Sequence, residues 1–187
     1  MTKRMFDLVL ATIAGLIFLI PLLLVALAVS LTSVGPVIYW SDRVGRRNVI
    51  FKMPKFRSML VNTPSVATHL LNDPDRFLTP IGRLLRKSSL DELPQLWSIL
   101  NGDMSFVGPR PALFNQDDLI ELRTREGVHE LTPGLTGWAQ VNGRDELPIP
   151  VKVKMDVEYL QRRSFIFDLH ILWLTFSKVL AREGVSH

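Results

Sequence analysis

The chain has 187 residues, enough for one domain with a hydrophobic core and too few to promise two. Its 22 Lys and Arg against 18 Asp and Glu give a mild positive excess, which suits nucleic acid, a membrane surface or a phosphate-rich substrate. There is no cysteine, so disulfide frameworks, thiolate catalysis and cysteine-based zinc sites are excluded. The four histidines lack the spacing of metal ligands, which argues against a histidine metal site: His69, His129, His170 and His187.

Residues 1–34 are predicted to form a membrane anchor. No charged residue appears between Asp7 and Asp42, and residues 8–31 are almost wholly apolar. This stretch exceeds the roughly 20 residues with which a helix crosses a bilayer. A secretory signal peptide is an alternative, because Ala26-Leu27-Ala28 imitates a cleavage site. The apolar region of a signal peptide is, however, usually only about 7 to 15 residues long.

Basic residues flank the apolar segment on both sides. Lys3 and Arg4 precede it, and six more follow it: Arg43, Arg46, Arg47, Lys52, Lys55 and Arg57. Because basic flanks favour the cytoplasmic side, a helix that crosses once cannot satisfy both ends, whereas one that breaks and returns can. Pro21 lacks the N–H that would bond the carbonyl of Ile17, so a kink is expected there. We therefore predict a re-entrant helix inserted in one leaflet, with a single spanning helix as the alternative.

Residues 35–187 are predicted to form one cytosolic, membrane-associated domain of the α+β class. Residues 35–59 alternate and are rich in β-branched and aromatic side chains around Val44-Gly45-Arg46, which predicts a β-hairpin. The proline-punctuated residues 61–80 predict a surface excursion. Short helices are predicted over residues 81–87, 93–100, 116–127 and 151–161.

Two further segments of the domain have a distinctive composition. Residues 131–148 are dense in glycine and proline and predict a set of ordered turns. Residues 169–180 predict a helix that is apolar on nearly every side, which is typical of a buried helix or one at a membrane interface. The sequence contains neither GxGxxG nor GxxxxGK[ST], so nucleotide binding by those loops is unsupported.

The stretch Ser89-Leu90-Asp91-Glu92 has two interpretations. It fits a capping box, with serine at the helix N-cap and glutamate three residues later. Pro94 would then fall at the fifth helical position, where its missing N–H and its ring destabilise a helix. With Asp91 as the N-cap, Pro94 takes the third position, whose N–H has no partner in the helix anyway. Asp91 would then stand at a positive helix end, where carboxylates stay ionised and phosphates bind.

A carboxylate that attacks a phosphate ester needs cations around it, because the phosphate oxygens repel an anion. Four basic residues lie nearby in the sequence: Arg83, Arg86, Lys87 and Arg110. Prolines on both sides hold the backbone of Arg110, and its planar guanidinium matches phosphate oxygens. Glu92 suits magnesium, which takes one or two carboxylates plus substrate phosphate oxygens. From these residues alone, Asp91 is either a helix cap or a nucleophile.

Seven features stand in order along the chain: KRMFD, the apolar segment, the hairpin, SSLDELPQL, GDMSFVGPRP, PGLTGWAQVNGR and a closing apolar helix. With them the chain strongly resembles the monotopic phosphoglycosyl transferases, also called bacterial sugar transferases, over essentially its whole length. The resemblance implies transfer of a sugar 1-phosphate from a UDP-sugar to a polyprenol phosphate, typically undecaprenyl phosphate, with release of UMP. The lipid-linked product would begin the assembly of a glycan such as O-antigen.

The resemblance also implies roles for particular residues. The family's Asp-Glu dyad matches Asp91 and Glu92, so Asp91 is expected to form a phosphosugar-aspartyl intermediate, and the pair to bind Mg²⁺. The residues matched to phosphate or nucleotide contacts or to the active-site network are Lys55, Arg57, Arg86, Arg110, Arg144 and Asp156. For the basic ones other than Arg110, the alternative is a solvated surface beside anionic lipid.

The same resemblance implies a location and partners. It places the chain on the cytosolic face of the bacterial inner membrane, with a UDP-sugar, undecaprenyl phosphate and membrane lipid as partners and no nucleic acid. An apolar anchor is compatible with a homo-oligomer. The chain resembles the small, minimal catalytic form of the family, whose members often use N-acetylated amino sugars.

The chain departs from the family pattern at two positions, and two other functions remain open. Ile20 stands where a serine often precedes the kink proline, and Ser41 stands where glutamine is common. One alternative function is a noncatalytic membrane-anchored protein that binds polyprenyl phosphate or acts as a scaffold. The other is a glycosyl transferase that passes on the sugar alone and releases UDP.

Overall fold

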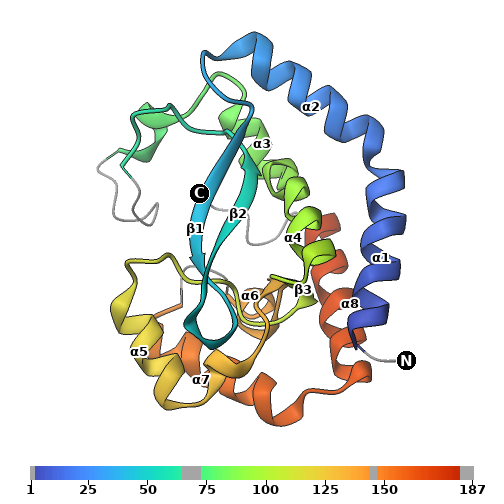
Figure 1. Cartoon of the computed structure of the whole chain (residues 1–187), viewed down its shortest axis with the longest axis vertical. Coiled ribbons are helices and arrows are strands. Elements are labelled where there is room, and N and C mark those ends of the chain that lie inside the picture. Colours follow the sequence, from blue (N-terminus) through green and yellow to red (C-terminus); the bar gives the residue numbers. More distant parts are fainter. Residues whose placement is uncertain (1–2, 65–72, 144–146, 182–187) are drawn as a thin grey trace.

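The computed structural model describes residues 3–64, 73–143 and 147–181. In these ranges helices surround an antiparallel hairpin and a second, parallel pair of strands (Figure 1). This confirms a small domain that mixes helix and sheet. The strands are β1 (Ile38–Val44), β2 (Ile50–Phe56), β3 (Ser105–Val107) and β4 (Gly134–Thr136). The α-helices are α1 (Lys3–Ile17), α2 (Leu19–Thr32), α3 (Gly82–Ser88), α4 (Leu96–Asn101), α5 (Asp117–Arg125), α6 (Trp138–Val141), α7 (Ile149–Arg162) and α8 (Phe165–Ala181).

The N-terminal apolar segment forms α1 and α2, which bend by 61° where they meet. The break falls at Phe18, directly after the carbonyl of Ile17 that Pro21 cannot bond, as the missing N–H predicts. In the described ranges no single helix is long and apolar enough to cross a membrane, whereas α1 and α2 together are, by length and composition. Figure 1 shows the two helices as an arc along one side of the molecule, with α2 ending near the start of β1.

The predicted hairpin is present as β1 and β2, with Tyr39 opposite Lys55 and Val44 opposite Ile50. Its connection contains a short 3-10 helix, Arg46–Asn48. The parallel pairing of β3 with β4, which sets Ser105 opposite Gly134, was not predicted. Each of these strands has three residues, too few for an alternating pattern to be visible, and β4 lies in a segment predicted to form turns.

The helices predicted after the hairpin are confirmed as α3, α4, α5, α7 and α8, with ends shifted by a few residues. The predicted N-cap at Asp91 is wrong. A 3-10 helix, η4 (Leu90–Gln95), precedes α4, and Asp91 lies in its first turn. Ser89 adopts a left-handed conformation that ends α3, and its N–H bonds the carbonyl of Arg86. The end of the preceding helix therefore sets the start of η4, and Pro94 does not.

Two glycines lie back to back where β3 meets β4. A Cβ on Gly134 would come within 2.1 Å of the backbone nitrogen of Gly108. We expect Gly134→Ala to destabilise the fold by about 1–3 kcal/mol, the usual cost of overpacking, and to lower the thermal unfolding midpoint in detergent. Gly15→Ala is the matched control, because an added Cβ there meets nothing within 4 Å. Equal unfolding midpoints for the two variants would contradict the packing.

Candidate active site

The Asp-Glu pair lies in η4, which packs against β2 of the hairpin. Ser89, directly after α3, adopts a left-handed backbone conformation, so the chain turns just before the pair. Apolar side chains of η4, α2 and β2 share one small core, including Val29, Phe56 and Leu93. Asp91 is only 8% exposed, so its carboxylate is largely removed from water.

Glu92 joins three separate segments of the chain. Its Oε1 accepts a hydrogen bond from Lys55 Nζ at 3.0 Å and another from Arg110 Nη2 at 2.9 Å. Burial alone would raise the pKa of Glu92, but the charges and hydrogen bonds of Arg110 and Lys55 outweigh it and hold that pKa well below its usual range. Glu92 therefore stays ionised and keeps two cations beside Asp91.

Asp91 has the opposite electrostatic character. Burial raises its pKa from the usual 3.8 to about 6; the charge of Lys55 opposes the rise and that of Glu92 adds to it. At neutral pH the carboxylate is mostly ionised, yet it is poorly solvated. A carboxylate with a raised pKa is more basic and hence more nucleophilic than one in water.

Arg110 is held through its backbone by a buried ion pair. Arg123 Nη1 donates to the carbonyl of Arg110 at 2.7 Å. The Nε–Nη2 edge of the Arg123 guanidinium binds Asp156 Oδ2, with Nε at 2.9 Å and Nη2 at 2.7 Å. Burial raises the pKa of Asp156, and the charge of Arg123 opposes that rise. Asp156 thus binds Arg123, which in turn bonds the backbone of Arg110.

The remaining predicted residues fall in different places. Arg86 lies near the dyad, where its charge lowers the pKa of Asp91. Arg57 is 4% exposed, and its Nη2 donates to the carbonyl and the hydroxyl of Ser33 at the end of α2, at 2.8 and 2.7 Å. Arg144 lies outside the described residues. The structure therefore gathers Lys55, Arg86 and Arg110 around the dyad and places Arg57 at the end of α2.

Sequence reasoning missed Arg123. In the sequence it lies in a charged, amphipathic helix, where an arginine normally faces water. Its partner, Asp156, is 33 residues away, so no local pattern could reveal the pair. Arg43 was also assigned no contact of its own, yet its Nη1 donates to the carbonyl of Pro111 at 3.2 Å. Arg43 and Arg123 each bond a backbone carbonyl of the loop that carries Arg110 and so stabilise its conformation.

The donor set at the dyad suits a magnesium ion that is shared with a substrate. The part of the chain that the structure describes contains no cluster of three His, Asp or Glu side chains suited to a metal. Mg²⁺ commonly takes one or two carboxylates and completes its shell with water and phosphate oxygens. Asp91 and Glu92 provide two adjacent carboxylates. Lys55 and Arg110 both bind Oε1 of Glu92, so these two contacts do not use its Oε2.

Residues 1–182 match the family model of the bacterial sugar transferases. The uncharacterized sugar transferase EpsL of Bacillus subtilis (strain 168) is 44% identical, over 98% of this chain and 90% of EpsL. The UDP-glucose:undecaprenyl-phosphate glucose-1-phosphate transferase of Escherichia coli (strain K12) is 43% identical, over 94% of this chain and 39% of the relative. The UDP-N-acetylgalactosamine-undecaprenyl-phosphate N-acetylgalactosaminephosphotransferase of Aeromonas hydrophila is 35% identical, over 97% of this chain and 44% of the relative. The chain thus spans most of EpsL and less than half of the other two.

Proposed function

Because the chain belongs to the bacterial sugar transferase family, we propose that it transfers a sugar 1-phosphate from a UDP-sugar to undecaprenyl phosphate and releases UMP. The pairing of Glu92 with Lys55 and Arg110, directly beside the buried Asp91, carries this proposal. The names of two relatives contain both substrates. Because the chain spans less than half of those relatives, both substrates are part of the proposal for this chain.

In the first step, a carboxylate oxygen of Asp91 attacks the sugar-linked phosphorus of the UDP-sugar. A bond forms between that oxygen and the phosphorus, and the bond from the phosphorus to the bridging oxygen breaks. UMP leaves with the bridging oxygen and its electron pair, and the sugar phosphate remains bound to Asp91. The covalent intermediate divides one difficult substitution into two easier ones.

The cations beside Asp91 offset the electrostatic repulsion between its carboxylate and the diphosphate of the substrate. Glu92 holds Lys55 and Arg110 in place, so both are pre-positioned for phosphate oxygens. The planar guanidinium of Arg110 can contact two phosphate oxygens at once. Mg²⁺ held by Asp91 and Glu92 would offset further charge on the diphosphate.

In the second step, a phosphate oxygen of undecaprenyl phosphate attacks the phosphorus of the intermediate and frees Asp91. This substrate is held in the bilayer while the UDP-sugar is soluble, so the site must lie at the membrane surface. We propose that α1 and α2 insert as a re-entrant anchor from the cytosolic face. Apolar side chains exposed along α8 add to the membrane-facing surface: Phe165, Ile166, Leu169, Trp173 and Phe176.

An N-acetylated amino sugar is the first candidate for the sugar, because small family members often use one. The relatives' names contain both N-acetylgalactosamine and glucose, so the test must include sugars of both kinds. A panel of UDP-sugars, incubated with magnesium and undecaprenyl phosphate, should give UMP from one of them. Release of UDP would identify a glycosyl transferase that moves the sugar alone. Absence of any nucleotide product would favour a noncatalytic polyprenyl-phosphate-binding protein.

A further inference from the structure

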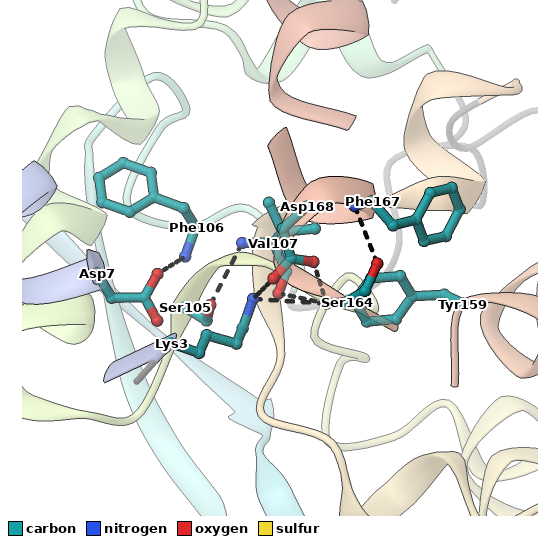
Figure 2. Close-up of polar contacts among 9 residues, drawn as sticks. All are labelled: Lys3, Asp7, Ser105, Phe106, Val107, Tyr159, Ser164, Phe167 and Asp168. Carbon is teal, nitrogen blue, oxygen red and sulfur yellow. Dashed lines mark hydrogen bonds and ion pairs between the residues drawn. The ribbon is translucent and has the colours of Figure 1, made fainter. Parts of the chain in front are cut away.

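The three charged residues of α1 all bond to the cytosolic domain. Lys3 Nζ lies 2.5 Å from Asp168 Oδ2 on α8, and Arg4 Nη2 donates to the carbonyl of Leu100 at 2.7 Å. Asp7 Oδ1 accepts the backbone N–H of Phe106 on β3 at 3.2 Å. Figure 2 shows Lys3 and Asp7 reaching from α1 to different partners, Asp168 and Phe106. The N-terminal end of α1, residues 3–7, is called the head of the anchor here. It is docked on the domain by these specific contacts.

The contact of Asp7 completes the hydrogen bonding of strand β3. On the side of β4, Ser105 N bonds the carbonyl of Pro133 at 2.9 Å. Successive N–H groups of a strand point to opposite edges, so that of Phe106 points away from β4. Asp7 is 3% exposed, and its carboxylate takes the place that a carbonyl of a third strand would occupy. Without it, a buried N–H would lose its partner, at a cost of about 1–3 kcal/mol.

Strand β3 leads directly to the active site. Phe106 lies four residues before Arg110, and Gly108-Pro109 makes the connection. The loop is anchored again where Gly134 N bonds the carbonyl of Pro109 at 2.9 Å. Arg110 then bonds Glu92 of the dyad. A displacement of Phe106 is thus passed along a short, fixed segment to the Arg110 side chain.

A second group of contacts ties the same helix head to the residue after Phe106. The Tyr159 hydroxyl donates to Asp168 Oδ1 at 2.7 Å and lies 3.3 Å from the carbonyl of Val107. Burial, together with the hydrogen bond to Asp168, raises the pKa of Tyr159, so the hydroxyl stays protonated and keeps its donor. Lys3 balances the charge of Asp168. The N-terminal end of α1 therefore meets α7 and α8 beside β3.

We propose that Asp7 is a positioning residue for Arg110, and that the head of the membrane anchor forms the outer edge of the active-site strand. This inference rests on the proposed function, because it assigns α1 a part in the first chemical step. That step uses only the soluble UDP-sugar and needs no lipid. If α1 served only to hold the protein at the membrane, substituting Asp7 would leave the rate of this first step unchanged.

The test is the single burst of UMP that the purified full chain releases from its UDP-sugar in detergent, without undecaprenyl phosphate. Asp7→Leu is nearly the same size but cannot accept a hydrogen bond. We expect it to slow the burst by about 10- to 100-fold, the scale of an active-site misplacement of roughly 1 Å. Asp7→Asn keeps an acceptor oxygen and should recover most of the rate. Thr12→Val is the control on α1, since the Thr12 hydroxyl is exposed and bonds the carbonyl of Leu8 in its own helix.

A double-substitution cycle separates positioning from general weakening of the fold. If Asp7 acts through Arg110, Asp7→Leu should slow the burst little further in an Arg110→Ala chain, followed over hours. An equal slowing in both backgrounds, or no slowing in either, would overturn the inference. Should Asp7→Leu not fold, Lys3→Met loosens the same helix head and enters the same cycle. A native chain that releases no UMP would instead refute the proposed function.

Discussion

The Asp91→Asn chain is expected to release no UMP and to form no phosphosugar adduct, a loss of at least about a thousandfold. The amide keeps the shape of the side chain but is a far poorer nucleophile towards phosphorus. Intact-mass measurement after incubation with the UDP-sugar should find the adduct on the native chain and none on the variant. Ordinary turnover by the variant would remove Asp91 as the nucleophile.

The same substitution should stabilise the fold, which makes loss of structure an unsuitable explanation for loss of activity. Raising the pKa of Asp91 from 3.8 to about 6 means that its ionised form costs about 3 kcal/mol of folding free energy. The cost is absent below about pH 4, where both folded and unfolded chains hold the proton. It grows as the pH rises towards 6 and is complete above that value.

Unfolding midpoints measured without magnesium provide the check on this stability effect. The native chain and Asp91→Asn should unfold at similar temperatures near pH 4, and the variant should unfold at the higher temperature near pH 7. A variant less stable than the native chain at pH 7 would show that the ionised carboxylate is well compensated in the fold. Membrane association should be the same for both, because Asp91 lies outside α1 and α2, the proposed anchor.

Asp156→Ala is expected to destabilise the fold by about 3–5 kcal/mol, because it leaves the buried guanidinium of Arg123 without its counter-charge. It should also slow UMP release, since Arg123 holds the carbonyl of Arg110. Thermal or denaturant unfolding measures the first effect, and the lipid-free burst of UMP measures the second. The matched control is Asp42→Asn, which breaks the exposed pair with Lys52 and should cost at most about 1 kcal/mol.

A double substitution distinguishes the two effects of Asp156. Arg123→Met with Asp156→Leu replaces the buried ion pair by apolar side chains, an exchange that is often neutral for stability. We expect the double variant to regain much of the stability but to remain slow, because the carbonyl of Arg110 has lost its donor. Recovery of the full rate along with the stability would show that the ion pair serves the fold alone.

Much of the architecture could be predicted from local pattern. Apolar length, the flanking basic residues and Pro21 predicted a broken helix, and the break appears where the carbonyl of Ile17 loses its partner. Alternation predicted the hairpin, and local pattern predicted α3, α4, α5, α7 and α8. These features depend on residues close together in the chain. The pairing of β3 with β4 joins segments about thirty residues apart and could not be found in this way.

The sequence by itself determined the family and predicted the dyad Asp91-Glu92 with the basic residues Lys55 and Arg110, because ordered local motifs carry both. Only the tertiary structure decided which cations meet the dyad, and it placed Arg57 at the end of α2. It also placed Asp156 behind Arg123 and turned Asp7 towards β3. Each of these contacts depends on burial and on pairing between distant segments, where the cost of an unpaired buried charge or N–H selects the partner. That selection is a property of the folded packing, which no local stretch of sequence contains.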